Sequence, residues 1–465
     1  MIDARVVEVF APVCADGRGR KGAGYLLGDG LVLTARHVIT GAIGPCDVRP
    51  LGRTGWTTTS VLWPGDEDGD GALLRVDGPV GDVDRIGLGR LVGNDRPACE
   101  AIGFPWAQLE RRGGGSVRKS EHLVGEVDRF SGQEPGVASW SLTIHARGSV
   151  PKSRTDGGSP WEGMSGAGLV CSGLLVGVVT IDPARFDADR LRAVPLTRLV
   201  ALPAFAEALH DARGDTVVLD AVEAQGVLER AYDPPPPRRA RQASSFLLGA
   251  RYGVVPFRPR PELERLRDWA HSSQDIDIAV LTGAAGVGKT RLARELCRQL
   301  ARVGWVAGSL AFRPDSEQLP RLAAADEAVL VVIDDYAETR RGDVLGLLER
   351  LTRRPTIQRP RRLLLAARQL GDWWTELQNE CADTEARDLL HYAPRIDVAA
   401  IEETAEDRVA VYREALAAYA PHTGSPRTDA TVPNLADQLF ETVLFVHMAA
   451  LRANDLVCAG VGGVM

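Results

Sequence analysis

GAGYLLGDGLVLTARHVI, residues 22–39, decides the fold class of the first half of the chain. It contains two short apolar runs, at 22–27 and 30–35, with a turn of glycine and aspartate between them. Further short apolar runs occupy 59–63, 72–76, 141–146, 167–181 and 192–196. Many short strands with frequent turn signals are typical of an all-β barrel or sandwich. Helix signals are scarce until 196–212, which we expect to close this domain as a helix.

The composition is that of an ordinary globular protein. The 465 residues allow two or three domains, and 45% hydrophobic with 25% charged residues provide for more than one core. The net charge of −7 and the isoelectric point of about 5.7 do not favour a nucleic-acid partner, which would select a basic face.

The cysteines and the N-terminus point to a reducing compartment. Seven widely spaced cysteines without a CxxC pair are expected to be buried, reduced thiols. Residues 1–22 lack the basic segment and apolar core of a secretion signal. No run of about 18 apolar residues suggests a membrane span. We therefore expect a cytoplasmic protein without a membrane partner.

The pattern changes after a proline-rich break. Residues 213–250 are predicted to form a linker, in which Pro234–Pro237 make a stiff, extended spacer. Beyond it, apolar strands at 276–283, 328–335 and 361–368 alternate with helical stretches at 261–273, 288–304 and 343–353. This alternation predicts a parallel sheet in residues 251–400. Residues 401–465 read as helical, with helices expected at 406–420 and 435–451.

Three motifs in residues 1–212 carry the groups that acyl transfer requires. His37 follows one strand, Asp70 precedes another, and Ser165 lies in the turn GMSGAG, residues 163–168. A nucleophile, a base and an anion that orients the base form a catalytic triad. The backbone amides of Gly163 and Ser165 are placed to stabilise an oxyanion. Each motif alone is weak, but their joint occurrence in one β-rich domain is a strong indication of catalysis.

Three stretches resemble the trypsin-like serine peptidase family, and within it the intracellular bacterial members. They are GAGYLLGDGLVLTARHVI, DGDGALLRV and GMSGAGLV. The resemblance implies a double β-barrel with His37 as general base, Asp70 as its orienting acid and Ser165 as nucleophile. Asp68 is a competing candidate for the acid, but Asp70 better matches the family's Asp-x-Ala-Leu-Leu pattern. Met164 stands where secreted members have the aspartate that pairs with a new N-terminus, so control is expected from elsewhere.

Substrate specificity stays open at this stage. Residues 156–161 are expected to line one wall of the primary specificity pocket, and residues 179–182 the opposing edge. Ser159 at the base of that pocket would favour small or apolar side chains, whereas Asp182 would favour a basic one.

A phosphate-binding motif opens the second half. GAAGVGKT, residues 283–290, fits GxxxxGK[ST] and stands between a strand and a helix, as its mechanism requires. Gly283, Gly286 and Gly288 would let the loop's backbone amides cradle phosphates. Lys289 would reach the β- and γ-phosphates, and the Thr290 hydroxyl would bind Mg²⁺.

Acidic and basic residues follow the next two strands. Asp334 is expected to act on Mg²⁺ and Asp335 to polarise an attacking water, while Arg368 would sense the γ-phosphate. For Arg368, a plain surface ion pair is the alternative.

Four stretches of the second half resemble the STAND class of P-loop NTPases, which contains the NACHT and NB-ARC switches. They are YGVVPFRPRPELERLRDW, GAAGVGKT, VLVVIDDYAE and LLLAAR. The resemblance implies ATP or ADP with Mg²⁺, and self-association in the activated state. LFETVLFVHMAAL resembles the class's lid helix, but Thr442-Val443-Leu444 replaces its nucleotide-contacting proline. The expected sensor repeats are missing after about residue 455, so we expect a truncated product or a sensor on another chain.

The leading hypothesis is an intracellular serine endopeptidase acting on protein or peptide substrates under the control of an ATP/ADP switch, in bacterial defence or signalling. The alternative is a nucleotide-dependent switch whose trypsin-like domain only binds peptides or partners. A transcriptional regulator is disfavoured by the acidic balance and by the absence of a recognisable DNA-binding segment.

Overall fold

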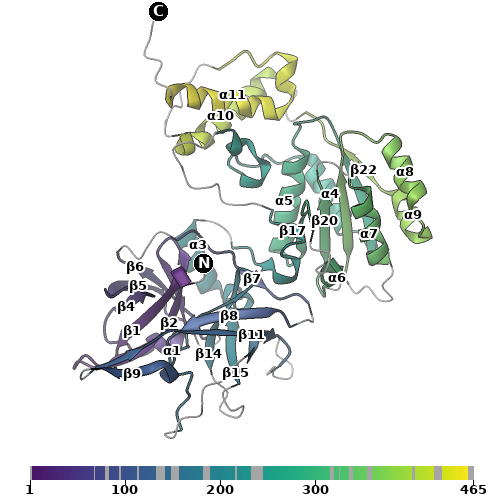
Figure 1. Ribbon diagram of the computed structural model, residues 1–465. Coiled ribbons are helices and arrows are strands. Elements are labelled where there is room, and N and C mark those ends of the chain that lie inside the picture. Colours follow the sequence, from purple (N-terminus) through teal and green to yellow (C-terminus); the bar gives the residue numbers. More distant parts are fainter. Residues whose placement is uncertain are drawn as a thin grey trace, which may run out of the picture. The chain divides into compact units, whose positions relative to one another are not determined.

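The computed structural model divides the chain into two compact units, Met1–Glu223 and Ala224–Met465 (Figure 1). The residues that it describes are 3–66, 69–78, 83–93, 96–112, 115–131, 142–147, 157–181, 189–214, 217–231, 244–314, 319–323, 325–334, 339–352, 359–400, 404–423 and 432–458.

The first unit begins with a closed six-stranded barrel. Its strands are β1 (Val6–Pro12), β2 (Gly19–Gly28), β3 (Leu31–Thr34), β4 (Cys46–Pro50), β5 (Thr57–Trp63) and β6 (Ala72–Val76), in the order β1-β2-β3-β6-β5-β4. All neighbouring strands are antiparallel. The short helix α1 (Arg36–Ile39) follows β3 directly. Large apolar side chains such as Leu26, Leu33 and Leu73 fill this barrel, and closure leaves it no free edge.

A second closed barrel follows in the same unit. It consists of β8 (Ala98–Gly103), β11 (Glu121–Asp128), β12 (Leu142–Ala146), β13 (Gly168–Cys171), β14 (Leu174–Ile181) and β15 (Arg190–Pro195), in the order β11-β12-β15-β14-β13-β8. The apolar run 167–181 is therefore a hairpin rather than one strand. Ser172 and Gly173, with φ of 48° and 77°, form its turn, as the twist of a two-residue hairpin loop requires.

Smaller elements complete the first unit. β9 (Leu109–Arg112) and β10 (Gly115–Arg118) form a hairpin, and β7 (Gly89–Arg90) pairs with β16 (Asp220–Ala221). The helical closure expected at 196–212 is two helices, α2 (Leu196–Ala201) and α3 (Pro203–Arg213), because Pro203 begins the second. The 3₁₀ helices are η1 (Asp3–Arg5), η2 (Trp106–Gln108) and η3 (Val222–Ala224).

The second unit is built on a six-stranded mixed sheet. The strands are β17 (Leu228–Glu229), β18 (Ile276–Thr282), β19 (Val306–Leu310), β20 (Val329–Ile333), β21 (Arg361–Ala366) and β22 (Arg395–Asp397), in the order β17-β19-β20-β21-β18-β22. β17 runs antiparallel to β19, and the other five strands are parallel. β21 thus lies between β18 and β20.

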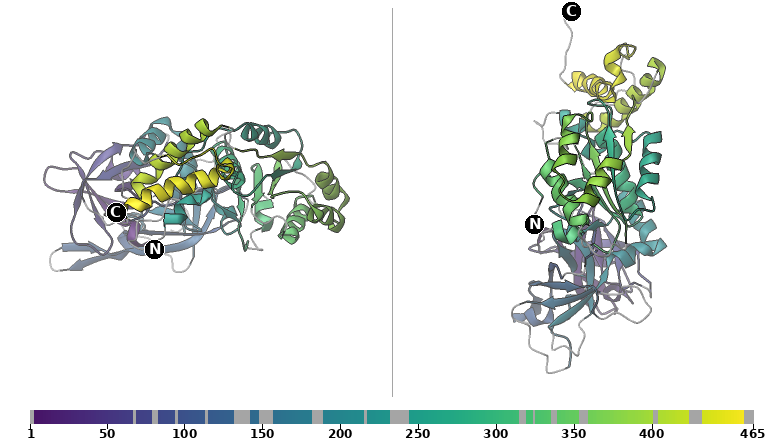
Figure 2. Two further views of the ribbon diagram at one scale, coloured as in Figure 1. Left: turned by 90° about the horizontal axis from the view of Figure 1, so that it is seen from above. Right: turned by 90° about the vertical axis from the view of Figure 1, so that its right-hand side faces the viewer.

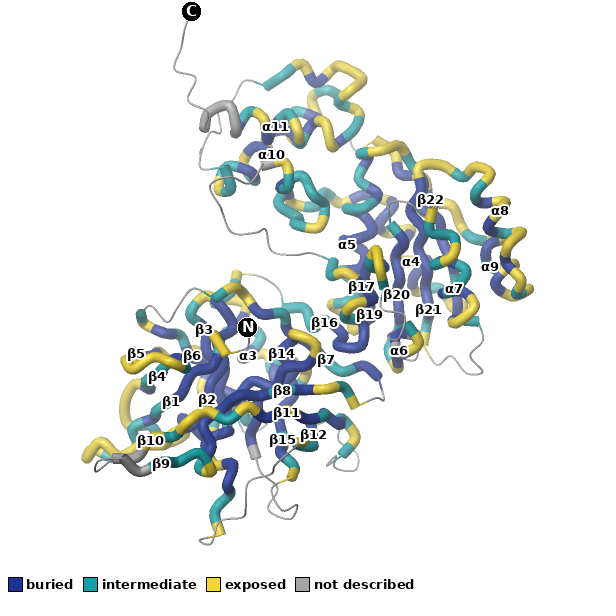
Figure 3. The backbone as a smooth tube through the Cα atoms, in the orientation of Figure 1, coloured by how far each residue is buried: buried dark blue, intermediate teal, exposed yellow. Residues whose placement is uncertain are grey.

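Helices cover both faces of this sheet (Figures 1 and 2). α4 (Pro261–Ala270) and α5 (Lys289–Arg302) pack on one face against alternate strand residues such as Leu281 and Val332. α7 (Arg341–Thr352) and α9 (Thr384–Tyr392) lie on the other, where Leu351 and Leu389 contact Ile276. Burial on two faces explains why these strands are continuous apolar runs, drawn dark blue in Figure 3.

The remaining helices lie at the sheet's periphery and in a C-terminal bundle. They are α6 (Leu319–Ala323), α8 (Asp372–Glu380), α10 (Ala405–Thr423), α11 (Val443–Cys458), η4 (Ser244–Leu248), η5 (Ala250–Tyr252) and η6 (Gln438–Glu441). α10 and α11 share an apolar core with η4 around Tyr412, Tyr419 and Val446.

The predicted fold class is confirmed: two six-stranded barrels are followed by an α/β sheet and C-terminal helices. Parts of the stretch expected as linker belong to the two units, since β16 pairs in the first and β17 in the second. Pro234–Pro237 lie outside the described residues. Within the described part of the chain, no helix is long and apolar enough to span a membrane.

Candidate functional sites

His37 and Asp70 meet because their strands pair. β3 and β6 are antiparallel neighbours with Thr34 opposite Ala72, so the residues after β3 lie beside those before β6. His37 Nδ1 lies 2.7 Å from Asp70 Oδ2, and the His37 backbone amide donates to Oδ1 at 3.0 Å. Two contacts to one carboxylate fix both the position and the rotation of the imidazole.

The carboxylate of Asp70 sets the tautomer of His37. Burial raises the pKa of Asp70, but the hydrogen bonds and charge of His37, together with Arg36, outweigh it and leave that pKa below the ordinary 3.8. An ionised carboxylate only accepts hydrogen bonds, so Nδ1 carries the proton. Nε2 of a neutral ring is then an acceptor, as a general base requires.

The turn around Ser165 can be made only with glycine at two places. Gly163 and Gly166 have φ of +103° and +92°. A Cβ on Gly163 would lie 2.2 Å from the Phe104 carbonyl oxygen, and one on Gly166 would lie 1.9 Å from that of Ala23. The motif GMSGAG therefore reflects a tight passage of the chain between the two barrels.

Ser165 belongs to the second barrel but lies against the first. The Ala23 amide of β2 donates to the Ser165 carbonyl at 2.8 Å. A Cβ on Gly22 would lie 2.9 Å from that same carbonyl oxygen and 2.6 Å from Val38, the residue after His37. The structure thus brings the Ser165 backbone close to the chain segment that carries His37.

The Ser165 hydroxyl donates to the Thr180 carbonyl at 3.0 Å. Among the described residues, no hydrogen bond joins it to His37. The backbone amides of Gly163 and Ser165 donate to no described residue, so both remain available to a substrate oxygen.

The residues expected to set specificity are only partly described. Ser159 Oγ accepts from the Trp161 amide at 3.0 Å, a local turn contact. Met164 is buried in the second-barrel core, with its sulfur near Gly103. Asp68, Asp156 and Asp182 lie outside the described residues.

In the second unit, GAAGVGKT forms the expected loop between β18 and α5. Gly283, Gly286 and Gly288 all have positive φ, and Lys289 opens the helix. Lys289 Nζ donates to the carbonyls of Gly283 and Ala284 at 2.7 and 3.0 Å. The amides at the start of α5 point along a helix axis whose dipole favours anions.

Thr290, in the first turn of α5, is in contact with Asp334, which directly follows β20. The Thr290 hydroxyl donates to Asp334 Oδ1 at 3.2 Å. A hydroxyl beside a carboxylate is an oxygen set that suits Mg²⁺. Asp335 lies outside the described residues.

Arg368 follows β21, the strand between those two, and its carbonyl accepts from the Gly283 amide at 3.3 Å. Its exposed guanidinium has no hydrogen-bond or ion-pair partner among the described residues.

A cavity of about 580 Å³, here called the P-loop cavity, joins this loop to the C-terminal helices. Its lining comes from residues 247–250, 253–258, 260, 285–291, 366–368, 411, 414, 419, 443, 444 and 447. The volume is within the range of small-molecule sites. The first turn of α11 lies against the loop, since the Leu444 amide donates to the Gly286 carbonyl at 3.2 Å. A proline at 444 could not make that bond.

Sequence reasoning missed two arginines that fasten the loop and the start of α5 to neighbouring segments. The buried Arg260 guanidinium donates to the Val287 carbonyl at 2.8 Å, and Arg291 donates to the Val255 carbonyl at 2.9 Å. These contacts could not be predicted from the sequence, because every residue has a backbone carbonyl and no residue pattern marks the ones that an arginine will bind.

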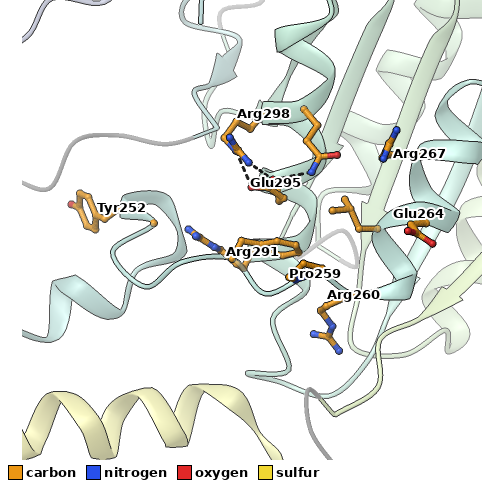
Figure 4. Close-up of a pocket in the computed structure, with 12 residues that line it drawn as sticks. Tyr252, Pro259, Arg260, Glu264, Arg267, Arg291, Glu295 and Arg298 are labelled. Carbon is orange, nitrogen blue, oxygen red and sulfur yellow. Dashed lines mark hydrogen bonds and ion pairs between the residues drawn. The ribbon is translucent and has the colours of Figure 1, made fainter. Parts of the chain in front are cut away.

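Arg260 and Arg291 also border a second hollow, of about 590 Å³, beside α4 and α5 (Figure 4). There Glu295 accepts from Arg298 and Gln299. The arginines beside that carboxylate are thus largely occupied by structural contacts.

Comparison with known proteins gives a partial likeness. No family model and no curated protein matches the chain. The active form of the Rv3671c protease from M. tuberculosis is similar at 19% identity with a TM-score of 0.30, over 43% of this chain and 79% of that one. Its inactive form is similar at 18% identity with a TM-score of 0.31, over 43% and 87%. The likeness concerns the fold of the N-terminal part, which holds the two barrels.

Proposed function

We propose that this chain is a serine endopeptidase in which Ser165 attacks a peptide carbonyl, His37 accepts its proton, and Asp70 orients His37. The contact that carries the proposal is the double hydrogen bond from His37 to Asp70. It holds one imidazole tautomer and leaves Nε2 facing away from the carboxylate, ready to accept a proton. Gly163 and Ser165 would supply the oxyanion with two amides that have no hydrogen-bond partner in the described part of the chain.

The resting hydroxyl position fits an enzyme under control. Ser165 donates to Thr180 and must turn toward His37 before attack. Met164 is packed in the core, so it offers no charge that a newly formed N-terminus could pair with. Control by cleavage of a zymogen is therefore disfavoured, and a second device on the same chain is the natural source of regulation.

That device is the P-loop of the second unit, which we propose binds ATP or ADP in the manner of STAND-class switches. Lys289 and the amides opening α5 would hold phosphates, while Thr290 and Asp334 would hold Mg²⁺, which neutralises phosphate charge when bound. Arg368 is suited to detect the terminal phosphate, because its guanidinium has no partner among the described residues. Arg368 follows β21, which lies between β18, the strand before the loop, and β20, the strand before Asp334.

A cleavage assay on a proteome-derived peptide library tests this function. The full chain would be assayed with ATP, ADP or neither, beside Ser165→Ala and Lys289→Ala. We expect cleavage that Ser165→Ala abolishes and a nucleotide response that Lys289→Ala removes. Cleavage that persists in Ser165→Ala would overturn the catalytic assignment, and a nucleotide response that survives Lys289→Ala would overturn the switch.

A further inference from the structure

His447 is a polar side chain in the P-loop cavity that the proposed chemistry does not use. It lies on α11 and lines the cavity together with Val443 and Leu444, which belong to the helix's first turn. Residues three and four positions apart share one helix face, so His447 faces the cavity one turn beyond the contact with Gly286. One turn advances about 5.4 Å along the axis. His447 is thus set back from the phosphate-binding loop.

The walls around His447 are mostly apolar and aromatic. The Arg291 guanidinium also lines the cavity, where it donates to the Ala250 and Val255 carbonyls. The His447 ring makes an edge contact with Tyr419 of α10, with 6.5 Å between the centroids. Leu247, Val255 and Val443 share one core cluster with Tyr419 and also line the cavity. The apolar part of this lining suits a flat ring that buries both faces better than it suits a sugar with several hydroxyls.

The imidazole is one of the polar groups in the cavity lining without a partner among the described residues, and the Arg368 guanidinium at the loop end is another. Among the described residues, no hydrogen bond or ion pair engages either ring nitrogen of His447. Glu414, another polar residue of the lining, is paired with Arg258 at 2.9 Å. A partly buried hydrogen-bonding group that is left unpaired costs free energy, which a ligand can recover.

The charge state of His447 also favours contact with a base over contact with a phosphate. Burial, followed by the positive charge of Arg291, lowers its pKa to about 4. The ring is therefore neutral near pH 7, with one donor and one acceptor nitrogen. A neutral imidazole complements the edge of a nucleobase, whereas a phosphate would favour the charged form.

We infer that His447 hydrogen-bonds the base of a nucleotide whose phosphates lie on the P-loop. This inference rests on the proposed nucleotide site and adds the residue that reads the base. The base would occupy the apolar part of the cavity between α10, α11 and the segment 247–256. The helix that carries His447 also contacts the loop through Leu444, so base and phosphates would engage the same helix.

Three probes separate the base from the rest of the nucleotide: ADP, ribose 5-diphosphate, which lacks the base, and inorganic pyrophosphate. Their affinities for the full chain would be measured by calorimetry or by competition. His447→Phe keeps an aromatic ring against Tyr419 but removes both hydrogen-bonding nitrogens. We expect this substitution to lower the affinity for ADP by about three- to tenfold, which is the contribution of one hydrogen bond. The affinities for the other two probes should not change.

Two further variants control the experiment. His447→Gln retains a donor and an acceptor and should restore most of the ADP affinity. His391→Phe makes the same change at the exposed end of α9, beside Tyr392, and should alter no affinity. Thermal melts establish that each variant is folded.

The outcomes are distinct. Unchanged ADP affinity in His447→Phe would overturn the inference, as would equal weakening of all three probes. If the affinities for ADP and ribose 5-diphosphate fall but that for pyrophosphate does not, His447 contacts the sugar, and the proposed base contact is overturned. If the wild type binds none of the probes, or binds them equally well after Lys289→Ala, the proposed nucleotide site itself fails.

Discussion

The two carboxylate oxygens of Asp70 are divided between two groups of His37: Oδ2 lies 2.7 Å from the ring nitrogen Nδ1, and Oδ1 accepts from the backbone amide. The pair is open to solvent on one side, since the His37 side chain is 45% exposed and that of Asp70 29%. The same carboxylate therefore anchors the short helix α1 and holds the ring in one tautomer.

Replacing Asp70 by asparagine should prevent His37 from acting as a base while the barrel stays folded. An amide can donate to Nδ1 and so favour the wrong tautomer, which removes the base at Nε2. We expect kcat/KM for a cleaved peptide to fall by about 10³–10⁴-fold. Asp16→Asn, on an exposed turn where Asp16 pairs with Arg18, is the matched control and should change little. An Asp70→Asn enzyme with near wild-type kcat/KM would refute the role.

The depressed pKa of Asp70 gives its ionised form a role in stability. A carboxyl whose pKa is lower in the folded than in the unfolded state stabilises the fold above its ordinary value, here 3.8. That contribution disappears as the pH falls through the folded-state pKa. Urea unfolding should therefore show a stability gap between wild type and Asp70→Asn that is widest near neutral pH and shrinks below pH 4. A gap that is constant with pH would contradict this account.

Gly163→Ala should lower activity because it displaces a backbone amide of the proposed oxyanion site. The new Cβ would meet the Phe104 carbonyl oxygen at 2.2 Å, so the loop must shift and the amide of residue 163 must move with it. Loss of one oxyanion donor typically lowers kcat by about 10²–10³-fold. Gly173→Ala is a close control, because Gly173 also has positive φ but has no atom within 4 Å of its Cβ position. It should lose about 1 kcal/mol of stability and keep its activity.

Thr290→Val should remove the dependence of nucleotide affinity on Mg²⁺. The substitution deletes the hydroxyl that faces Asp334 and keeps the branched shape of the side chain. The ratio of ATP affinities with and without Mg²⁺ should fall by at least about tenfold. Thr352→Val, on α7, removes a hydroxyl whose one hydrogen bond among the described residues is to its own helix at Leu348, and it should leave the ratio intact. Equal ratios in wild type and Thr290→Val would argue against a metal at this place.

Much of the fold could be predicted because the motifs flank the strands that carry them. The strand before His37 and the strand after Asp70 are both apolar runs, and they are neighbours in the barrel. The P-loop similarly follows β18, one of the predicted buried strands. What the patterns did not reveal was strand order, since pairing partners such as β8 and β11 are brought together by tertiary packing.

Other features have no local signature. Arg361 and Arg362 look like solvent-facing charges at the start of a strand, yet both are buried. Arg362 donates to the carbonyls of Ala270, Ser272 and Gln274, which compensate for its lost water. The direction of the Ser165 hydroxyl is equally hidden, because it depends on a carbonyl fifteen residues away at Thr180.

Labelling of the full chain with a fluorophosphonate, followed by mass mapping of the adduct, is the most direct test of the central claim. A fluorophosphonate bonds covalently to a serine that a base has activated. We predict one adduct, on Ser165, that is lost in Ser165→Ala and strongly reduced in Asp70→Asn. Equal labelling of wild type and Ser165→Ala, or an adduct mapped to another residue, would contradict the assignment of Ser165 as the nucleophile.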